Sequence, residues 1–146
     1  FARSVDLTSN AWAYHGLACL YLKSDPEKAK QFIMEGMALQ RERLSYQKEG
    51  FKILEKCGAY KEIDEEYKKQ TAENQKNGRI QYYYVAALAK LERNEEAYHL
   101  LNDGDGIDVS DIREGDSDIQ SIWESLHEKV YGEKGHLPHY YNFKVN

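Results

Sequence analysis

The chain has 146 residues, of which 41% are hydrophobic and 31% charged, a balance typical of a folded, soluble protein rather than a disordered one. No apolar run approaches the roughly 18–20 residues that span a bilayer, so we expect no membrane-spanning segment. The net charge of −5 is uneven (16 basic and 15 acidic side chains in residues 1–101, 4 and 10 in residues 102–146), and neither part offers the basic stripe that nucleic-acid phosphates require.

The first predicted element is a helical hairpin over residues 8–38. Ser9 or Asn10 can cap its first helix, and the apolar positions of that helix are Trp12, Leu17, Leu20 and Tyr21. The segment Ser24-Asp25-Pro26-Glu27 ends this helix and begins a second one, because a capping side chain followed by proline is typical of a helix start. The second helix presents one apolar face, formed by Ala29, Phe32, Ile33 and Met37.

Two further hairpins are predicted, over residues 41–72 and 78–101. One turns at Gly58-Ala59, and the other begins after Asn77-Gly78 and turns near Arg93-Asn94. No proline lies between residues 27 and 57, so periodicity alone allows one helix of 31 residues there. An uncapped helix of that length is unusual in a small domain, and we therefore predict a bend near Leu39–Arg43.

The hairpins repeat with a period of 34 residues. Shifting the chain by this period aligns Leu17/Phe51/Val85, Leu20/Leu54/Leu88, Ala29/Ile63/Ala97 and Ile33/Tyr67/Leu101. The same shift aligns Gly16 with Gly50. Glycine inside a helix costs about 0.5–1 kcal/mol relative to alanine, so we predict that two helices approach closely at both positions.

This repeat resembles the tetratricopeptide repeat, whose pattern has an early aromatic residue, a small residue four positions later and an alanine in the second helix. The matching residues are Trp12, Gly16 and Ala29 in the first copy, Tyr46, Gly50, Ile63 and Tyr67 in the second, and Ala97 in the third, where Tyr84 replaces the glycine. The resemblance implies an all-α fold, in which residues 1–101 form a right-handed superhelix of about three tetratricopeptide-like hairpins.

An acidic loop is predicted over residues 102–117. Its first residues, Asn102 to Asp108, lack the spacing of a calcium-binding loop, because Ile107 takes a place that needs an oxygen ligand. Residues 118–146 are predicted to form a capping helix and an extended tail. The helix can be capped by Asp116 or Ser117, and its apolar face is formed by Ile119, Ile122, Trp123, Leu126 and Val130. We expect this face to cover the last hairpin, with Trp123 as a core anchor.

The C-terminal half resembles the end of a bacterial protein family. The matching residues are Gly78-Arg79-Ile80, Leu91-Glu92-Arg93, Glu95-Glu96-Ala97, Asp111–Asp116, Ile122-Trp123, Leu137-Pro138 and Asn142-Phe143. Members of that family join a β-rich, mutarotase-like domain of unknown function to a long tetratricopeptide array. Because the chain also begins at Phe1 rather than Met, we expect it to be a C-terminal segment of a larger bacterial protein.

Residue patterns for catalysis or metal binding are missing. The adjacent acids Glu65/Glu66 and Glu95/Glu96 point in different directions on their helices, so we interpret them as solvated faces and not as the facing carboxylates of a glycosidase. His136 and His139 lie in the predicted tail, without the fixed spacing of a metal site. We therefore predict a protein that is not an enzyme and that holds neither a cofactor nor a metal.

The two cysteines also have no metal-binding or disulfide pattern. Cys19 and Cys57 are separated by 38 positions, and neither belongs to a C-x-x-C motif. We predict two small, buried, free thiols in a reducing compartment, and hence a cytoplasmic location.

Tyrosine is the one anomaly in the composition, with twelve copies. Three consecutive tyrosines, residues 82–84, fan around a helix, so at most two of them can face the core. The repeat register places six residues in a concave partner-binding groove: Tyr14, Tyr21, Gln47, Lys48, Gln81 and Tyr82. Two alternatives stay open, namely aromatic filling between helices and occupation of the groove by the aromatic tail after Gly135.

The sequence thus predicts a non-catalytic scaffold that mediates protein–protein or interdomain contacts. Its partner would be a protein or an upstream domain of the same chain, with neither nucleic acid nor a membrane involved. The alternative is an accessory domain of a carbohydrate-active enzyme whose catalytic domain lies upstream.

Overall fold

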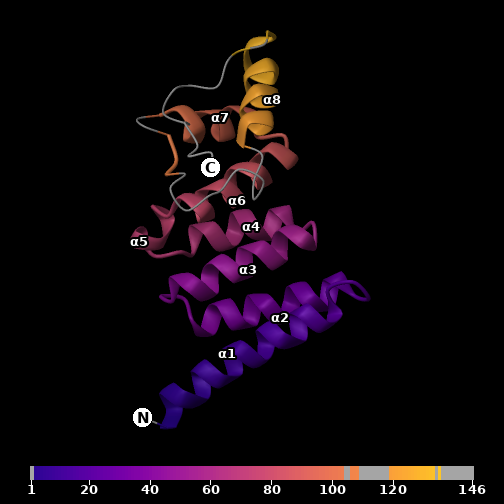
Figure 1. The fold of residues 1–146 in the computed structure, drawn as a ribbon, viewed down its shortest axis with the longest axis vertical. Coiled ribbons are helices and arrows are strands. Elements are labelled where there is room, and N and C mark those ends of the chain that lie inside the picture. Colours follow the sequence, from indigo (N-terminus) through magenta and orange to yellow (C-terminus); the bar gives the residue numbers. More distant parts are fainter. Residues whose placement is uncertain (1, 104–105, 109–118, 134, 136–146) are drawn as a thin grey trace, which may run out of the picture. The chain divides into compact units, whose positions relative to one another are not determined.

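A computed structural model describes residues 2–103, 106–108, 119–133 and 135, with the backbone alone at residues 2–9 and 120. The secondary structure of these residues is entirely helical (Figure 1), which confirms the predicted all-α class. The helices are α1 (Ala2–Tyr21), α2 (Pro26–Leu39), α3 (Leu44–Lys56), α4 (Tyr60–Lys68), α5 (Ala72–Gln75), α6 (Gly78–Lys90), α7 (Asn94–Asn102) and α8 (Ile119–Tyr131). No helix in this part of the chain is long and apolar enough to cross a membrane.

The chain forms two compact units, Phe1–Asn74 and Gln75–Asn146. In the first unit, α1 packs against α2, α2 against α3 and α3 against α4, and successive helices run in opposite directions (Figure 1). The largest side chains that are fully buried in this unit are Ile33, Met37, Tyr46, Phe51, Leu54 and Ile63. The predicted apolar face of α2 is confirmed at Ala29, Ile33 and Met37, while Phe32 is half-buried.

Two turns of the first unit follow the sequence prediction. The Asp25 side chain accepts a hydrogen bond from the backbone N–H of Lys28 at 3.2 Å, and Pro26 is the first residue of α2. Between α3 and α4 the chain turns at Gly58, whose φ of 69° lies in the left-handed region that favours glycine. Local chemistry at these positions is therefore sufficient to end one helix and begin the next.

The predicted bend between α2 and α3 is also confirmed, since α2 ends at Leu39 and α3 begins at Leu44. No glycine or proline causes it. Instead, the side-chain amide of Gln47 donates to the carbonyl oxygens of Met37 at 3.0 Å and of Gln40 at 2.7 Å. Both carbonyl groups also accept a backbone hydrogen bond, Met37 O from Gln40 at 3.3 Å and Gln40 O from Arg43 at 3.0 Å, so the Gln47 amide adds a second donor that joins α3 to the end of α2.

The first helix differs from the prediction at its start. It begins at Ala2 and not after Ser9 or Asn10, which therefore lie inside α1. The physical reason is that no glycine or proline interrupts residues 2–9, and an interior serine or asparagine costs a helix less than about 0.7 kcal/mol.

The buried face of α1 is also not the predicted one. Ala11 and Ala18 are fully buried, whereas Trp12, Leu17 and Leu20 are exposed. The small side chains face inward because α1 packs closely along α2.

The two aligned glycines have different surroundings. A Cβ atom on Gly50 would overlap the Met37 side chain, so the predicted close approach is confirmed there. A Cβ atom on Gly16 would meet nothing within 4 Å, so the prediction is wrong at that position. Helix packing requires a glycine only where a second helix lies against it, and α1 has no such neighbour over Gly16.

A glycine that the repeat did not single out makes the closest contact in this unit. A Cβ atom on Gly36 would overlap the Tyr46 hydroxyl group and would lie 3.2 Å from the carbonyl oxygen of Ala11. The absence of that atom lets the Tyr46 hydroxyl donate to Ala11 O at 2.5 Å. Tyr46 is fully buried, and burial, followed by the negative charge of Cys19 when ionised, raises the pKa of Tyr46 to about 12.

In the second unit, α6 and α7 form a hairpin that α8 covers. Asn77 caps α6 by accepting from the backbone N–H of Ile80 at 3.1 Å, and α7 begins at Asn94, next to the predicted turn. Trp123 of α8 is 4% exposed, and its indole N–H donates to Asn102 Oδ1 at 2.8 Å. The predicted covering helix and its core anchor are therefore confirmed.

The acidic segment is anchored at its start. Ile107 is 3% exposed, and the carbonyl oxygen of Asp108 lies where a Cβ atom of Gly78 would be. The apolar residue that breaks the calcium-loop pattern thus has a packing role. The caps predicted at Asp116 or Ser117, and the aromatic tail after Gly135, lie outside the described residues.

The glycine contacts predict opposite effects of two alanine substitutions. Gly36→Ala should lower the free energy of unfolding by about 3 kcal/mol, because the new methyl group displaces Tyr46 from its buried acceptor. Gly16→Ala should raise it by about 0.5–1 kcal/mol, because the methyl group enters open space on an exposed helix. Urea unfolding followed by circular dichroism measures both values, and a shift of the same sign in the two variants would contradict this account.

Tyr46 also predicts an alkaline transition. Its pKa in the folded state lies above the unfolded value of about 10, so its contribution to stability is complete below pH 10 and is lost as the pH rises to about 12. We expect a loss of about 2–3 kcal/mol in the free energy of unfolding over this interval. Tyr46→Phe should be less stable at neutral pH and show a flatter decline, which urea midpoints at several pH values would reveal.

Candidate functional site

The six residues predicted to line a groove are distributed over both units. Tyr14 and Tyr21 lie on α1, half-buried against the ring of Phe32, with centroid distances of 6.2 and 5.8 Å. Lys28 Nζ lies 5.0 Å from the Tyr21 ring centroid, a cation–π contact. Glu35, as a hydrogen-bond acceptor and a negative neighbour, raises the pKa of Tyr14. These two tyrosines thus belong to a partly exposed aromatic patch.

The other four predicted residues differ in their accessibility. Lys48 on α3 and Gln81 and Tyr82 on α6 are half-buried. Gln47 is fully buried, which corrects its assignment as a groove contact. Its side chain is directed inward because it caps the end of α2.

Gln47 belongs to a buried polar network at the α2–α3 bend. Its Oε1 accepts from Gln70 at 2.7 Å and from Arg41 at 3.5 Å. Asn74 donates to Gln70 Oε1 and to the carbonyl oxygen of Arg41, each at 3.2 Å. Buried amide groups are costly unless they are hydrogen-bonded, and here each side chain uses its neighbour.

The same network contains an acid that the sequence analysis placed on a solvated face. Glu66 is 1% exposed, whereas Glu65, Glu95 and Glu96 are exposed as predicted. Arg41 pairs with Glu66 Oε1 at 2.7 Å, and Lys69 pairs with Glu66 Oε2 at 3.3 Å. Charge compensation from two cations allows burial, and no feature of the Glu65-Glu66 pair alone distinguishes the buried member.

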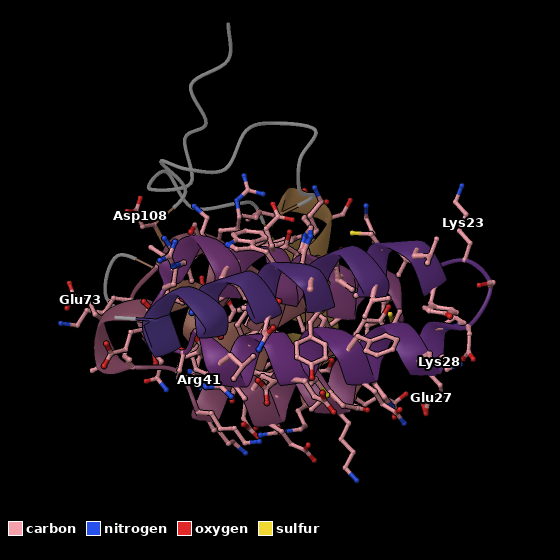
Figure 2. All side chains as sticks on the ribbon, turned by 90° about the horizontal axis from the view of Figure 1, so that it is seen from below. Lys23, Glu27, Lys28, Arg41, Glu73 and Asp108 are labelled. Carbon is pink, nitrogen blue, oxygen red and sulfur yellow. The ribbon has the colours of Figure 1, made fainter. Side chains whose placement is uncertain are left out.

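An open pocket of about 580 Å³ lies at this bend, lined by Ala38 to Arg43. Figure 2 shows Arg41 at the end of α2 away from Glu27 and Lys28. The Arg41 guanidinium is held by Glu66 from inside the unit, and Arg43 Nε donates to Gln40 Oε1 at 3.0 Å. The positive charge of Arg41 at the pocket is therefore already neutralised.

The large hydrophobic side chains that are exposed in the described part of the first unit all lie on α1. Together with the exposed Ala13 and Gly16 they are named here the α1 surface, which consists of Trp12, Ala13, Gly16, Leu17 and Leu20. Trp12 is 40% exposed, Leu17 37% and Leu20 70%. No Asp, Glu, Lys or Arg occurs from Leu7 to Leu22. A helix with one buried face normally carries charges on the other, so this stretch was the signal that the sequence analysis missed.

The repeat register makes the α1 surface distinctive. Leu17 aligns with Phe51 and Val85, and both of these are 0% exposed. Leu20 aligns with Leu54 and Leu88, which are also 0% exposed. The first copy therefore exposes two side chains whose equivalents in the other copies are fully buried.

A polar cluster borders the α1 surface. Cys19 Sγ lies 3.9 Å from His15 Nδ1, one helical turn away, and His15 Nε2 lies 3.5 Å from Glu49 Oε2 on α3. Nε2 is buried and has no hydrogen-bond partner. Both cysteines are free, as predicted, but Cys19 is exposed and Cys57 half-buried, so the prediction of two buried thiols is wrong.

The second unit contains an aromatic cluster between α7 and α8. His127 stacks on Trp123 with 5.0 Å between ring centroids and an interplanar angle of 14°. Tyr131 lies 5.0 Å from the His127 ring, and the Tyr98 hydroxyl is 2.9 Å from His127 Nδ1. These contacts join the covering helix to the hairpin, which makes a packing role sufficient for His127.

Within the described parts of the chain, no group of three His, Cys, Asp or Glu side chains has the arrangement of a metal site. His136 and His139 lie outside those parts. No family model matches the sequence, and neither does a curated protein or a solved structure.

The buried ion pair predicts a strong effect of losing one partner. Arg41→Met leaves the Glu66 carboxylate, whose side chain is 2% exposed, with only Lys69 as a cation. The free energy of unfolding should fall by about 3 kcal/mol, measured by urea denaturation. Glu27→Gln is the matched control, because the Lys30–Glu27 distance is also 2.7 Å but Glu27 is 72% exposed. That change should cost less than about 1 kcal/mol, and equal losses would contradict the assigned role of burial.

Proposed function

We propose that this chain is part of a non-catalytic, tetratricopeptide-like helical scaffold, and that its α1 surface binds the apolar face of another stacked helical hairpin. The scaffold would hold protein–protein or interdomain contacts in place by stacking hairpins side by side. Each hairpin of such a stack buries its apolar face only against a neighbour. The observation that carries the proposal is the exposure of Leu17 and Leu20 at positions that are buried in both other copies.

The equivalent contact inside the first unit indicates what kind of helix fits. Gly50 of α3 lies under the Met37 side chain of α2. Gly16 is the aligned residue of α1, and it is open. We therefore infer that the occupant resembles α2 and presents a flexible apolar side chain over Gly16. The cost of a glycine inside α1, about 0.5–1 kcal/mol, would then be offset by close packing.

The charge of the α1 surface supports the same occupant. No Asp, Glu, Lys or Arg occurs between Leu7 and Leu22, and the nearby carboxylate of Glu49 lies against His15, so the surface offers a strongly charged ligand little to bind. An uncharged apolar helix face gains from burial of Leu17, Leu20 and Trp12, at roughly 25 cal/mol per Å² of apolar surface. Exposed apolar patches of this kind are typical of protein contact sites.

Other repeat positions support the tetratricopeptide-like assignment. Ala29, Ile63 and Ala97, which open the second helix of each copy, are all 0% exposed. Ile33 and Leu101 are 0% and 1% exposed at a later aligned position, where Tyr67 is half-buried. A position that is buried in successive copies is what stacked helical hairpins require.

A fusion protein tests the proposal. Residues 10–43 are duplicated directly before Asn10, so that a second α2 and its bend precede α1 in the 34-residue register. In the repeat register Ala13 is equivalent to Gln47, whose side-chain amide donates to the carbonyl oxygens at the natural α2–α3 bend. We therefore add Ala13→Gln in the original copy, so that the same amide is present at the new bend. The added Met37 should then pack on Gly16, and Leu20 should become buried.

The experiment measures how much Leu20→Glu lowers the free energy of unfolding in the unmodified chain and in the fusion. In the unmodified chain, where Leu20 is 70% exposed, the substitution should change the free energy of unfolding by less than about 0.5 kcal/mol. In the fusion it should cost about 2–4 kcal/mol, because it buries a carboxylate without a partner. Gln31→Glu, on the exposed side of α2, is the control and should be neutral in both. An equal, small cost of Leu20→Glu in the two proteins would refute docking on the α1 surface.

A further inference from the structure

We propose that Cys19, His15 and Glu49 form a thiol-modification site, at which Cys19 undergoes thiol–disulfide exchange with a low-molecular-weight disulfide. This site lies beside the α1 surface and does not depend on the proposed scaffold role. Three side chains from two helices make it more than an isolated cysteine: a nucleophile, a base within reach of it, and an acid behind the base.

The geometry gives each side chain a separate task. Cys19 and His15 are four residues apart on α1, which places them on the same side of the helix, and Sγ lies 3.9 Å from Nδ1. Glu49 Oε2 lies 3.5 Å from Nε2, the opposite ring nitrogen. Although this distance is not a hydrogen bond, the negative charge of Glu49 favours a proton on the nearer ring nitrogen, Nε2, and so leaves the Nδ1 lone pair facing the thiol.

The other cysteine provides a comparison within the same molecule. Cys57 is half-buried, and burial raises the pKa of its thiol. Structural thiols in such surroundings are inert, whereas reactive ones are accessible and lie next to a group that stabilises the thiolate. Cys19 is exposed and has His15 beside it.

The exchange step balances without another reagent. The Cys19 proton moves to His15 Nδ1, and the thiolate attacks one sulfur of the small disulfide. A new S–S bond joins Cys19 to that sulfur while the old S–S bond breaks, so Cys19 is oxidised and the leaving sulfur is reduced. The leaving thiolate takes the proton from the imidazolium, whose charge Glu49 stabilises in the meantime.

Modification of Cys19 would compete with helix docking. In the repeat register Cys19 aligns with Ile53 and Ala87, which are 3% and 0% exposed. A helix seated on α1 therefore needs the space that an adduct on Cys19 would occupy. This consequence, unlike the exchange itself, rests on the proposed scaffold function.

The full chain with Cys57→Ser, treated with oxidised glutathione and followed by intact mass spectrometry, measures the rate at Cys19. At neutral pH we expect His15→Asn to slow it about fivefold and Glu49→Gln about twofold. Glu42→Gln, which removes an exposed charge from the α2–α3 bend, should have no effect. Cys57, measured in the Cys19→Ser chain, should react at least about tenfold more slowly than Cys19.

The pH dependence of the exchange rate shows whether His15 acts as a base or only affects the access of the disulfide to Cys19. In the described part of the chain, the titratable side chains near this thiol are His15 on α1, which has Glu49 of α3 at its other ring nitrogen, and Tyr46 on α3. In strongly alkaline buffer hydroxide replaces a protein base in removing a thiol proton, so His15→Asn and its parent should react at equal rates there. Equal rates at neutral pH, or the same slowing at both pH values, would overturn the site.

The fusion protein distinguishes this proposal from the scaffold role. The added hairpin carries its own copy of Cys19, which is changed to serine so that only the original Cys19 is measured. The docked helix should protect the original Cys19 from reaction with oxidised glutathione. If the unmodified chain reacts as expected but the fusion gives no protection, the thiol site stands and docking fails. The opposite result is that His15→Asn does not slow the exchange in the unmodified chain, while Leu20→Glu costs more stability in the fusion than in that chain. In that case docking stands and the thiol site fails.

Discussion

The side-chain amide of Gln47 holds the bend on which the stacking of the first unit depends. By donating to the carbonyl oxygens of Met37 and Gln40, it ends α2 where no glycine or proline would. Arg41 and Gln70 then bond to its oxygen, and Glu66 is buried against Arg41. Asn74, which donates to the carbonyl oxygen of Arg41, and the backbone bond from Arg43 to Gln40 O hold the same bend.

The bend determines which faces meet. Once α3 folds back, Met37 lies over Gly50 and Tyr46 reaches Ala11 past Gly36. Both contacts depend on the absence of a side chain at a helical glycine. The same arrangement leaves Leu17 and Leu20 of α1 exposed in the described part of the chain. Under the proposed scaffold function, the α1 surface is the face that a further hairpin would cover.

The polar groups of the first unit differ in their burial between the α2–α3 bend and the edge of α1. At the bend, Glu66 and Gln70 are buried and fully engaged, so they contribute rigidity and no reactivity. At the edge of α1, Cys19 is exposed beside the half-buried His15, whose buried Nε2 has no hydrogen bond. Accessibility and an unsatisfied group together make this edge the more reactive part of the unit.

The sequence by itself determined the helical class, the period of 34 residues and the turns, because Asp25, Pro26, Gly58 and Asn77 act on their own neighbours. It also located the bend near Leu39, but not its cause. Tertiary structure alone decided that Gln47 and Glu66 are buried while Leu17 and Leu20 are exposed. Periodicity shows that a side chain is apolar and on which side it lies, whereas burial depends on which helix packs there, a contact between residues distant in sequence.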